Sequence, residues 1–445
     1  MEDPAPRTRR ETTATPQAQI SLDTSLSEEI PQQDDQTSCD ALAELLTNQD
    51  LDIEFQPILS LRHQSVVGIE ALARPRTMGL VQMFLEAETT GRMLELDRLC
   101  RLKALESYSR LRFAEGCRPL LFLNFESSVI DRGVLGSGWL LERVKASGLE
   151  PSDVVIEVNE SRVHDLESLR DFVDTYRRHG FLIALDDLGA GDSNLPRIAQ
   201  LRPHIIKLDR HLVAHVDRDF FKQETIKSLV NLSRSIGCMV LAEGVETHAE
   251  VDTCASLGAE LLQGFFFARA RKAEQLDLPS LLEPLAQATR RQRTHATDSL
   301  KARRQQSLDL QRLAQQGCAG LQKAKRQDFD AALWELVANN TGIEAAYLLD
   351  DQGIQVSETH MASDVTVLPS RLFEPARRGS DHSFKEYFFS LIDTGLSRFT
   401  TNSYISLATG NPCRTVAVLL RHMQTASNYV LCIDFRMPAS FSSHF

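Results

Sequence analysis

The sequence has no closely spaced pair of cysteines. Its eight cysteines are scattered over 445 residues, which indicates neither a zinc ribbon nor a disulfide scaffold and favours reduced thiols in a cytosol. No apolar run approaches the roughly 18 residues that a membrane helix needs. The first residues carry charge and proline but no apolar signal-peptide segment. These absences predict a soluble, cytoplasmic protein without a membrane partner.

An excess of positive charge is also lacking. The formal net charge of -12 argues against a general affinity for DNA or RNA, although a locally basic pocket could still bind one phosphodiester. No glycine-rich phosphate loop of the GxGxxG or GxxxxGK[ST] type follows an early strand, which disfavours a nucleotide-binding open sheet. What remains is an ordinary globular composition, 42% hydrophobic and 25% charged, in a chain long enough for two or three domains.

The chain divides into four segments by composition. Residues 1–38 are rich in Pro, Thr, Gln and acids, and we expect a disordered tail there. Residues 39–280 alternate short apolar runs with amphipathic segments, which predicts βα units around a parallel sheet. Their number suits a closed (β/α)8 barrel, with an open doubly wound sheet as the alternative.

The third and fourth segments differ from the barrel. Residues 281–327 are expected to form a helical linker, because residues 287–327 hold ten Lys and Arg against two acids and no proline. Its basic face could be solvated or bind nucleic acid, and its leucines could contact a partner helix or the barrel. Residues 328–445 predict a small α+β domain with a five-stranded antiparallel sheet, in which the turn "DDQG" leads to a strand "IQVSE".

Polar side chains stand at the ends of the predicted barrel strands. The carboxyl ends of barrel strands converge on one face, where active sites lie. The residues at these ends are Glu70, Asn124, Glu157, Asp186, Asp187, Lys207, Glu243 and Gln263. With Glu246 they form an oxygen-rich cluster without His or Cys, which suits Mg²⁺, Mn²⁺ or Ca²⁺.

The adjacent Asp186 and Asp187 need compensation for their mutual repulsion. Two divalent ions about 3.5 to 4 Å apart would neutralise that repulsion and activate a water against a phosphodiester. Lys207 would orient the water or stabilise negative charge on the phosphoryl oxygens. The alternatives are a helix N-cap or a solvated loop for the aspartates, and an ordinary surface position for the lysine.

Eight short motifs follow one another between residues 40 and 275. In order they are "FQPI", "EALAR", "LNFES", "IEVNE", "DDLGAGDSNL", "IKLD", "AEGVET" and "QGFFF". Through them the chain resembles the EAL-domain family of cyclic di-GMP phosphodiesterases. The resemblance implies a TIM-like (β/α)8 barrel with one reversed strand and a homodimer. It also implies hydrolysis of cyclic di-GMP to linear pGpG with Mg²⁺ or Mn²⁺.

The resemblance also implies roles for individual residues. Metal ligands would be Glu70, Asn124, Glu157, Asp186 and Asp187. The second metal, the water and their hydrogen bonds would be held by Lys207, Glu243, Glu246 and Gln263. Substrate contacts would come from Gln56, Leu72, Arg74 and Asp97, with Arg74 on a phosphate. Glu160 would brace the loop after Asp187.

The loop "DDLGAGDSNL" departs from the family's usual DDFGTGYSSL. The replacements are Leu188, Ala190, Asp192 and Asn194. In the family this loop couples the dimer interface to the second metal, so loss of a threonine hydroxyl at Ala190 would weaken activity or make it conditional. A catalytically weak cyclic di-GMP receptor and a protein-interaction scaffold are therefore the alternatives to a phosphodiesterase.

The C-terminal domain resembles a PAS or cache sensory fold. Tyr387, Tyr404 and Arg414 would contact an unknown small ligand there, or the aromatic residues would only fill the core of a dimerisation domain. No GGDEF-like motif occurs, so synthesis of the messenger is not expected. We therefore expect a phosphodiesterase regulated by its C-terminal domain.

Overall fold

The structure is a computed structural model, and it describes residues 38–113, 118–131, 138–159, 165–189, 195–367 and 374–437. The expected N-terminal tail up to residue 37, Glu160 and the loop replacements at 190, 192 and 194 lie outside the described residues. The chain forms two compact units. Unit 1 holds residues 1–214 and 225–289, and unit 2 holds residues 215–224 and 290–445.

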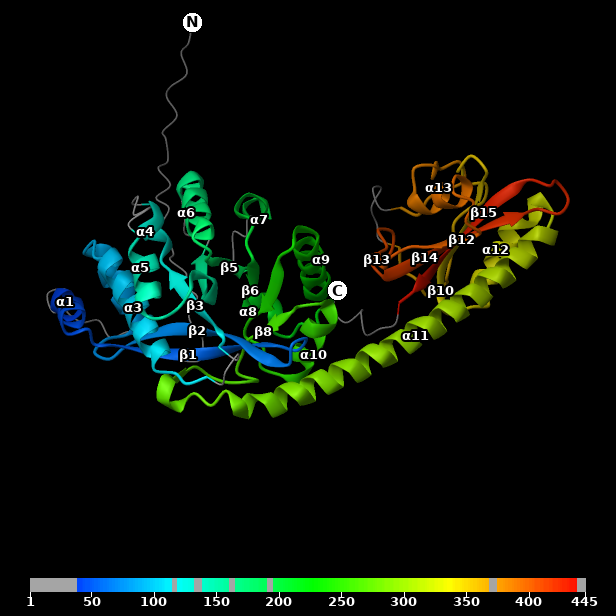
Figure 1. The fold of residues 1–445 in the computed structure, drawn as a ribbon. Helices are drawn as coiled ribbons and strands as arrows, with labels where there is room; N and C mark the ends of the chain where they lie inside the picture. Colours follow the sequence, from blue (N-terminus) through cyan, green and yellow to red (C-terminus); the bar gives the residue numbers. More distant parts are fainter. Residues whose placement is uncertain are drawn as a thin grey trace, which may run out of the picture. The chain divides into compact units, whose positions relative to one another are not determined.

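Unit 1 is built on a closed barrel of eight strands (Figure 1). The barrel strands are β1 (Leu51–Ser60), β2 (Ser65–Pro75), β3 (Leu120–Phe125), β4 (Val154–Asn159), β5 (Leu182–Leu188), β6 (Ile205–Leu208), β7 (Met239–Ala242) and β8 (Leu261–Leu262). Neighbours from β2 to β8 are parallel, whereas β1 is antiparallel to both β2 and β8 and closes the ring. The short β9 (Arg271–Lys272) also pairs with β1. The closed barrel with one reversed strand is thus confirmed.

Helices cover the outside of the barrel (Figure 1). They are α1 (Ser38–Asn48), α2 (Leu80–Thr89), α3 (Met93–Ser109), α4 (Ser127–Asp131), α5 (Trp139–Ala146), α6 (Leu166–Arg178), α7 (Leu195–Leu201), α8 (Arg210–Val213), α9 (Phe220–Ile236) and α10 (His248–Leu257). α6 begins at Asp165, whose carboxylate accepts a hydrogen bond from the Glu167 N–H. α10 begins with a reciprocal capping box between Thr247 and Glu250.

The barrel strands are apolar because both of their faces are covered. Inside the barrel, Ile58, Phe122, Val155 and Leu241 belong to one core cluster and are almost completely buried. β4 is buried over its whole length until Asn159. This packing fixes the strands as a rigid frame, so the polar side chains at their carboxyl ends are held in place by the core beneath them.

β5 departs from regular pairing where the two aspartates stand. Leu185 pairs with Ile206 and Leu188 with Leu208, so β5 has one residue more than β6 over this stretch. Asp187 has a φ of 57°, a left-handed conformation that is unfavourable for residues other than glycine. This β-bulge allows the side chains of Asp186 and Asp187 to line one cavity although they are consecutive in a strand.

Unit 2 contains a six-stranded antiparallel sheet. Its strands are β10 (Ile343–Asp350), β11 (His360–Met361), β12 (Arg398–Thr400), β13 (Tyr404–Ile405), β14 (Pro412–Arg421) and β15 (Asn428–Arg436). The segment "IQVSE" makes only isolated bridges, such as Leu349 with Gln355, so the strand expected there is wrong. Its backbone N–H groups bond to loop carbonyls as well as to β10, for example Gln355 to Ser380.

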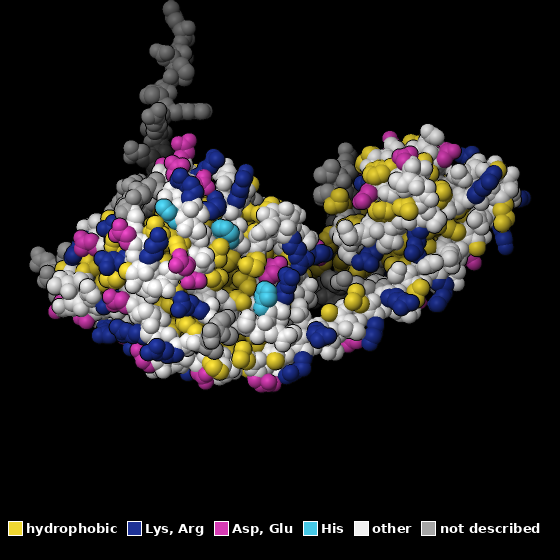
Figure 2. Space-filling model, viewed as in Figure 1, with side chains coloured by type: hydrophobic (Ala, Val, Ile, Leu, Met, Phe, Trp, Pro, Cys, Tyr) yellow, Lys and Arg dark blue, Asp and Glu magenta, His cyan; other side chains and the backbone are white. Residues whose placement is uncertain are grey.

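Helices pack on both faces of this sheet. α12 (Phe329–Ala338) and the last turns of α11 (Leu282–Lys323) share one core cluster with Val416 and Leu420, whereas α13 (Glu386–Ile392) packs on the other face against Ala417. Lys and Arg side chains line the exposed middle of α11 (Figure 2). In the part of the chain that the structure describes, no helix combines the length and hydrophobicity needed to cross a membrane.

Candidate active site

The centre of the candidate site is the ammonium group of Lys207, on β6. The side chain is almost fully buried, and its Nζ atom is surrounded by carboxylates from four other strands or strand ends. The distances are 2.7 Å to Glu157, 2.8 Å to Glu243, 2.9 Å to Asp186 and 3.7 Å to Glu70. The barrel topology therefore brings together five side chains that lie up to 173 residues apart, between Glu70 and Glu243.

Electrostatics keep Lys207 charged. Burial alone would lower the pKa of its ammonium group, but the carboxylates of Asp186, Glu157 and Glu243 outweigh burial and raise this pKa well above its usual value. Burial, followed by the neighbouring carboxylate of Glu70, raises the pKa of Glu157 well above its usual value. Burial likewise raises the pKa of Glu243. The cluster therefore holds more carboxyl groups than one lysine can keep ionised.

Glu70 behaves differently because it receives hydrogen bonds. Burial opposes its ionisation, yet the charge of Lys207 and hydrogen bonds from Gln263 and Asn124 together lower its pKa. Asn124 donates from Nδ2 to one oxygen at 3.0 Å, and Gln263 donates from Nε2 to the other at 2.7 Å. These two amides fix the Glu70 carboxylate in its ionised form.

Gln263, which follows β8, also contacts Gln56 on the neighbouring strand β1. Its Nε2 lies 3.1 Å from Oε1 of Gln56, whose own amide donates to the carbonyl of Ala268 at 3.1 Å. The carbonyl oxygen Oε1 of Gln263 is buried and has no hydrogen-bond partner among the described residues. A buried carbonyl without a donor is costly, so this atom is available to a cation or a water.

A close approach of backbone holds Gln263 in position. A Cβ atom on the next residue, Gly264, would lie 2.1 Å from the carbonyl oxygen of Val245. The Val245 N–H donates to the carbonyl of Gln263 at 3.1 Å. Only glycine fits here, and it brings the Gln263 segment directly against the segment that follows Glu243.

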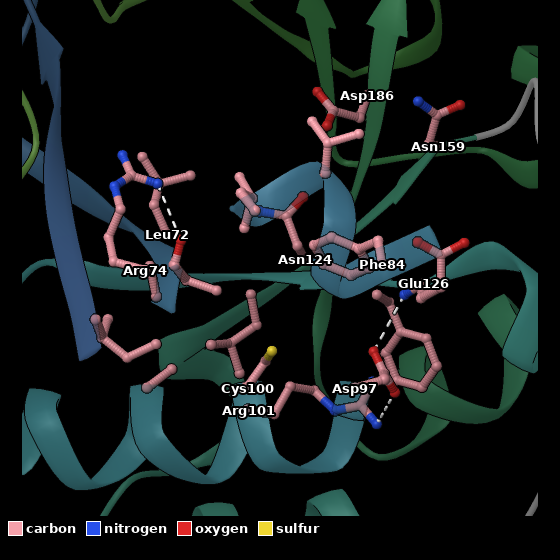
Figure 3. Close-up of a pocket in the computed structure, with 18 of the residues that line it drawn as sticks. Leu72, Arg74, Phe84, Asp97, Cys100, Arg101, Asn124, Glu126, Asn159 and Asp186 are labelled. Atoms are coloured by element: carbon pink, nitrogen blue, oxygen red, sulfur yellow. Dashed lines mark hydrogen bonds and ion pairs between the residues drawn. The ribbon is translucent and has the colours of Figure 1, made fainter. Parts of the chain in front are cut away.

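Most of the remaining predicted site residues line a cavity, whereas Glu246 lies outside the Lys207 cluster. Asp187 accepts a hydrogen bond from Asn159 and lines the cavity with Leu72, Arg74 and Asp97 (Figure 3). Arg74 is partly exposed and pairs with Glu54 at 2.9 Å. Glu246 is also partly exposed and pairs with Arg210 at 2.8 Å, outside the Lys207 cluster.

Sequence reasoning missed several cavity residues. Asn159 stands two positions after Glu157 on β4, so strand alternation could have placed it on the same side. Glu126, Cys100 and Arg101 line the cavity as well (Figure 3). Cys100 and Arg101 belong to α3, and attention to strand ends alone could not find them.

The predicted sensory residues do not meet at one place. Tyr387 is buried and its hydroxyl lies 3.0 Å from that of Tyr347, while Tyr404 bonds to Thr415 and Asp434. Side chains alternate between the two sheet faces along β14, so Arg414 is on the same face as Val416 and Val418. Those two valines pack in the core cluster on the opposite face from Tyr387. One ligand therefore cannot contact Tyr387 and Arg414 on the same sheet face.

The donor set fits a hard divalent cation. The cluster offers only carboxylate and amide oxygens, with an unpaired buried carbonyl at Gln263, and such oxygens are the ligands of Mg²⁺, Mn²⁺ and Ca²⁺. As the side chains stand, no group of three or more His, Cys, Asp and Glu among the described residues is arranged to hold a metal ion.

The closed barrel with one reversed strand carries an acidic cluster around a buried lysine, and this combination can be compared with known protein families. The family model described as "EAL domain" matches residues 17–270, more than half of the chain. The chain belongs to the EAL domain family.

The chain is also similar to individual EAL-domain proteins. The uncharacterised EAL-domain protein YkuI of Bacillus subtilis is 26% identical, over 84% of this chain and 92% of its own length. The crystal structure of YkuI, in complex with substrate c-di-GMP and calcium, matches with a TM-score of 0.71 and 24% identity over 89% of this chain and 99% of that one. This likeness extends over both units, and it shows the fold alone.

A second relative matches about half of the chain. The bifunctional diguanylate cyclase/cyclic di-GMP phosphodiesterase MucR of Pseudomonas aeruginosa is 28% identical over 53% of this chain. The match spans 35% of the length of MucR.

Proposed function

We propose that this protein is a metal-dependent phosphodiesterase that hydrolyses cyclic di-GMP to linear pGpG. The observation that carries the proposal is the buried Lys207 ammonium among four carboxylates at the end of the barrel. Related EAL-domain proteins support it, because YkuI binds c-di-GMP and MucR is a cyclic di-GMP phosphodiesterase.

The proposed metal ligands are residues on the barrel strands β2 to β5. Divalent Mg²⁺ or Mn²⁺ would be held by Glu70, Asn124, Glu157, Asp186 and Asp187. When bound, the ions would supply positive charge to the phosphodiester and lower the pKa of the attacking water. With metal present, Lys207 would be released from part of its carboxylate contacts.

The chain's own side chains then have distinct tasks. Lys207 would place its positive charge beside the phosphoryl oxygens, where negative charge develops during in-line attack. Glu243 would accept a proton from the attacking water, since burial already raises the pKa of its carboxyl group. Gln263 would keep Glu70 ionised and oriented. Arg74, at the cavity wall, would bind a phosphate oxygen.

The functional test is hydrolysis by the purified full-length protein. Cyclic di-GMP is incubated with Mg²⁺ or Mn²⁺ and pGpG is separated by chromatography, beside Glu70→Ala. The control is Glu106→Gln, an exposed carboxylate on α3 that pairs with Lys103. Product from wild type and the control, but not from Glu70→Ala, supports the proposal. Bound nucleotide without product from wild type would instead assign a receptor.

Regulation by the C-terminal unit belongs to the same proposal. This unit contains a buried polar network around His382. Nδ1 of His382 lies 2.9 Å from the Tyr387 hydroxyl, and Nε2 lies 3.1 Å from the amide oxygen of Gln355. A ligand competing for these bonds would change how α13 packs.

We propose a homodimer as the active form. Light scattering on the full-length protein tests it, and a monomer with full turnover would contradict it.

A further inference from the structure

The cavity beside the acidic cluster extends well beyond it. Its volume is about 220 Å³. Asp186 lies at one end, and the other end reaches α3, where Arg101 and Asp97 stand (Figure 3). Asp187 also lines the cavity. A substrate whose phosphate lies at the acidic end would therefore place its next group towards α3.

Arg101 is a buried cation in the wall of this cavity. Its exposed fraction is 3%, and its guanidinium carbon lies 3.7 Å from the centre of the Phe125 ring. Nη2 pairs with Oδ2 of Asp97. The other two nitrogens, Nε and Nη1, are buried and have no hydrogen-bond partner among the described residues. Leaving charged donors without acceptors is costly, so a ligand that supplies acceptors would be favoured.

Asp97 holds the guanidinium in place. Its second carboxylate oxygen, Oδ1, accepts the backbone N–H of Glu126 at 3.2 Å. Both oxygens of Asp97 are therefore engaged, one by Glu126 and one by Arg101. Among the described residues, Nε and Nη1 of Arg101 are buried donors without a hydrogen-bond partner, and a ligand with acceptors would complement them.

The walls around Arg101 favour a flat aromatic group over a phosphate. The Phe125 ring lies against the Arg101 guanidinium, and Val81, Phe84 and Leu123 are further apolar or aromatic residues of the cavity wall. A purine base suits such walls and carries acceptors on its edge. Guanine presents two neighbouring acceptors, O6 and N7, whereas adenine presents N7 beside an amino donor.

We propose that Arg101 selects guanine over adenine by donating hydrogen bonds to the O6 and N7 edge of a base in this cavity. The inference rests on the proposed function, because it assumes that a cyclic dinucleotide binds with its phosphate at the acidic cluster. It adds to that function a specificity residue on a helix, remote from the strand ends.

The test compares two cyclic dinucleotides with the full-length protein. Dissociation constants for cyclic di-GMP and cyclic di-AMP are measured by calorimetry with Ca²⁺, the ion in the YkuI complex. Arg101→Leu should weaken cyclic di-GMP binding by about 10-fold to 100-fold, the usual value of a base-edge contact. The dissociation constant for cyclic di-AMP should change much less, so the ratio of the two dissociation constants should move towards one.

Two further variants separate recognition from structure. Arg98→Leu removes a half-buried arginine one turn earlier on α3 that is not part of the cavity wall, and it should keep the wild-type preference. Arg101→Lys retains a positive charge for Asp97 but lacks the planar guanidinium that can donate two parallel hydrogen bonds. It should therefore lose the preference for cyclic di-GMP over cyclic di-AMP, and it provides the test if Arg101→Leu fails to fold.

The outcomes are distinguishable. An unchanged ratio of the two dissociation constants in both Arg101 variants would overturn the inference, as would an equal loss for both nucleotides. A wild-type protein that binds neither nucleotide would overturn the proposed function and this inference with it.

Discussion

The Nζ atom of Lys207 lies 2.7 Å from Oε1 of Glu157, and both side chains are almost wholly buried. Because a buried ion pair depends on both partners, removal of either leaves uncompensated charge in a medium of low polarity. A variant that lacks one partner is therefore expected to be less stable than the wild type.

Lys207→Met should destabilise the metal-free protein by about 3 to 5 kcal/mol, because the surrounding carboxylates lose the cation that lies 2.7 to 2.9 Å from Glu157 and Asp186. Mg²⁺ should restore much of this loss. The measurement is thermal unfolding in EDTA and in Mg²⁺, with Lys145→Met, an exposed lysine on α5, as control. Wild-type stability of Lys207→Met in EDTA would contradict the charge balance described here.

Gln263→Ala should lower turnover of cyclic di-GMP by about 10-fold to 100-fold, the usual effect of losing a group that orients a metal ligand. The reason is the loss of its hydrogen bond to Glu70. Steady-state kinetics should show the effect mainly in kcat. Gln82→Ala, on the exposed side of α2, serves as control, and equal rates for the two variants would refute the orienting role.

Gly264→Ala should destabilise unit 1 by about 1 to 3 kcal/mol, as overpacking does, because the new Cβ would overlap the backbone of Val245. The added methyl group should also displace Gln263 and reduce hydrolysis. Gly79→Ala is the matched control, since a Cβ at Gly79 meets nothing within 4 Å. Urea unfolding of both variants decides the matter, and similar midpoints would argue against the close approach.

Asp434 should make unit 2 less stable as pH rises. Burial raises the pKa of its carboxyl group to about 6, above the unfolded value of about 4. Between these values the folded state keeps a proton that the unfolded state has lost, so stability falls as pH rises from about 4 to about 6, by at most about 3 kcal/mol.

The variant Asp434→Asn tests this pH dependence, because it cannot ionise. Its unfolding free energy should vary less over the same pH range and exceed that of the wild type at pH 7. Urea titrations at pH 4, 5, 6 and 7 measure the difference. Parallel pH profiles for the two proteins would show that Asp434 does not titrate in this range.

The sequence predicted the barrel because its strands are apolar runs that end in polar residues, and the same rule located Lys207 and the carboxylates around it. The convergence of strand ends follows from topology alone. The contact between Gln56 and Gln263 joins residues 207 positions apart. Such a contact depends on side-chain packing, which periodicity does not encode.

Helix residues and short strands were harder to predict. Arg101 belongs to α3, and a helical pattern shows which face is apolar without showing that a cation faces a cavity. In unit 2, "IQVSE" has the composition of a strand, yet its backbone N–H groups bond to different partners, Gln355 to the loop carbonyl of Ser380 and Val356 to Leu348 on β10. Local composition could not show that this segment lacks a regular strand partner.

The bulge in β5 means that the acidic site depends on the number of residues as well as on their identity. Between Leu185 and Leu188 this strand is one residue longer than its partner. A substitution at Asp187 would change a side chain without changing the number of residues between Leu185 and Leu188. Deleting one residue would let the ladder run regularly into Leu188, and the strand would then present a single carboxylate to the cavity. Insertions and deletions, more than substitutions, are therefore the changes that this stretch cannot accommodate.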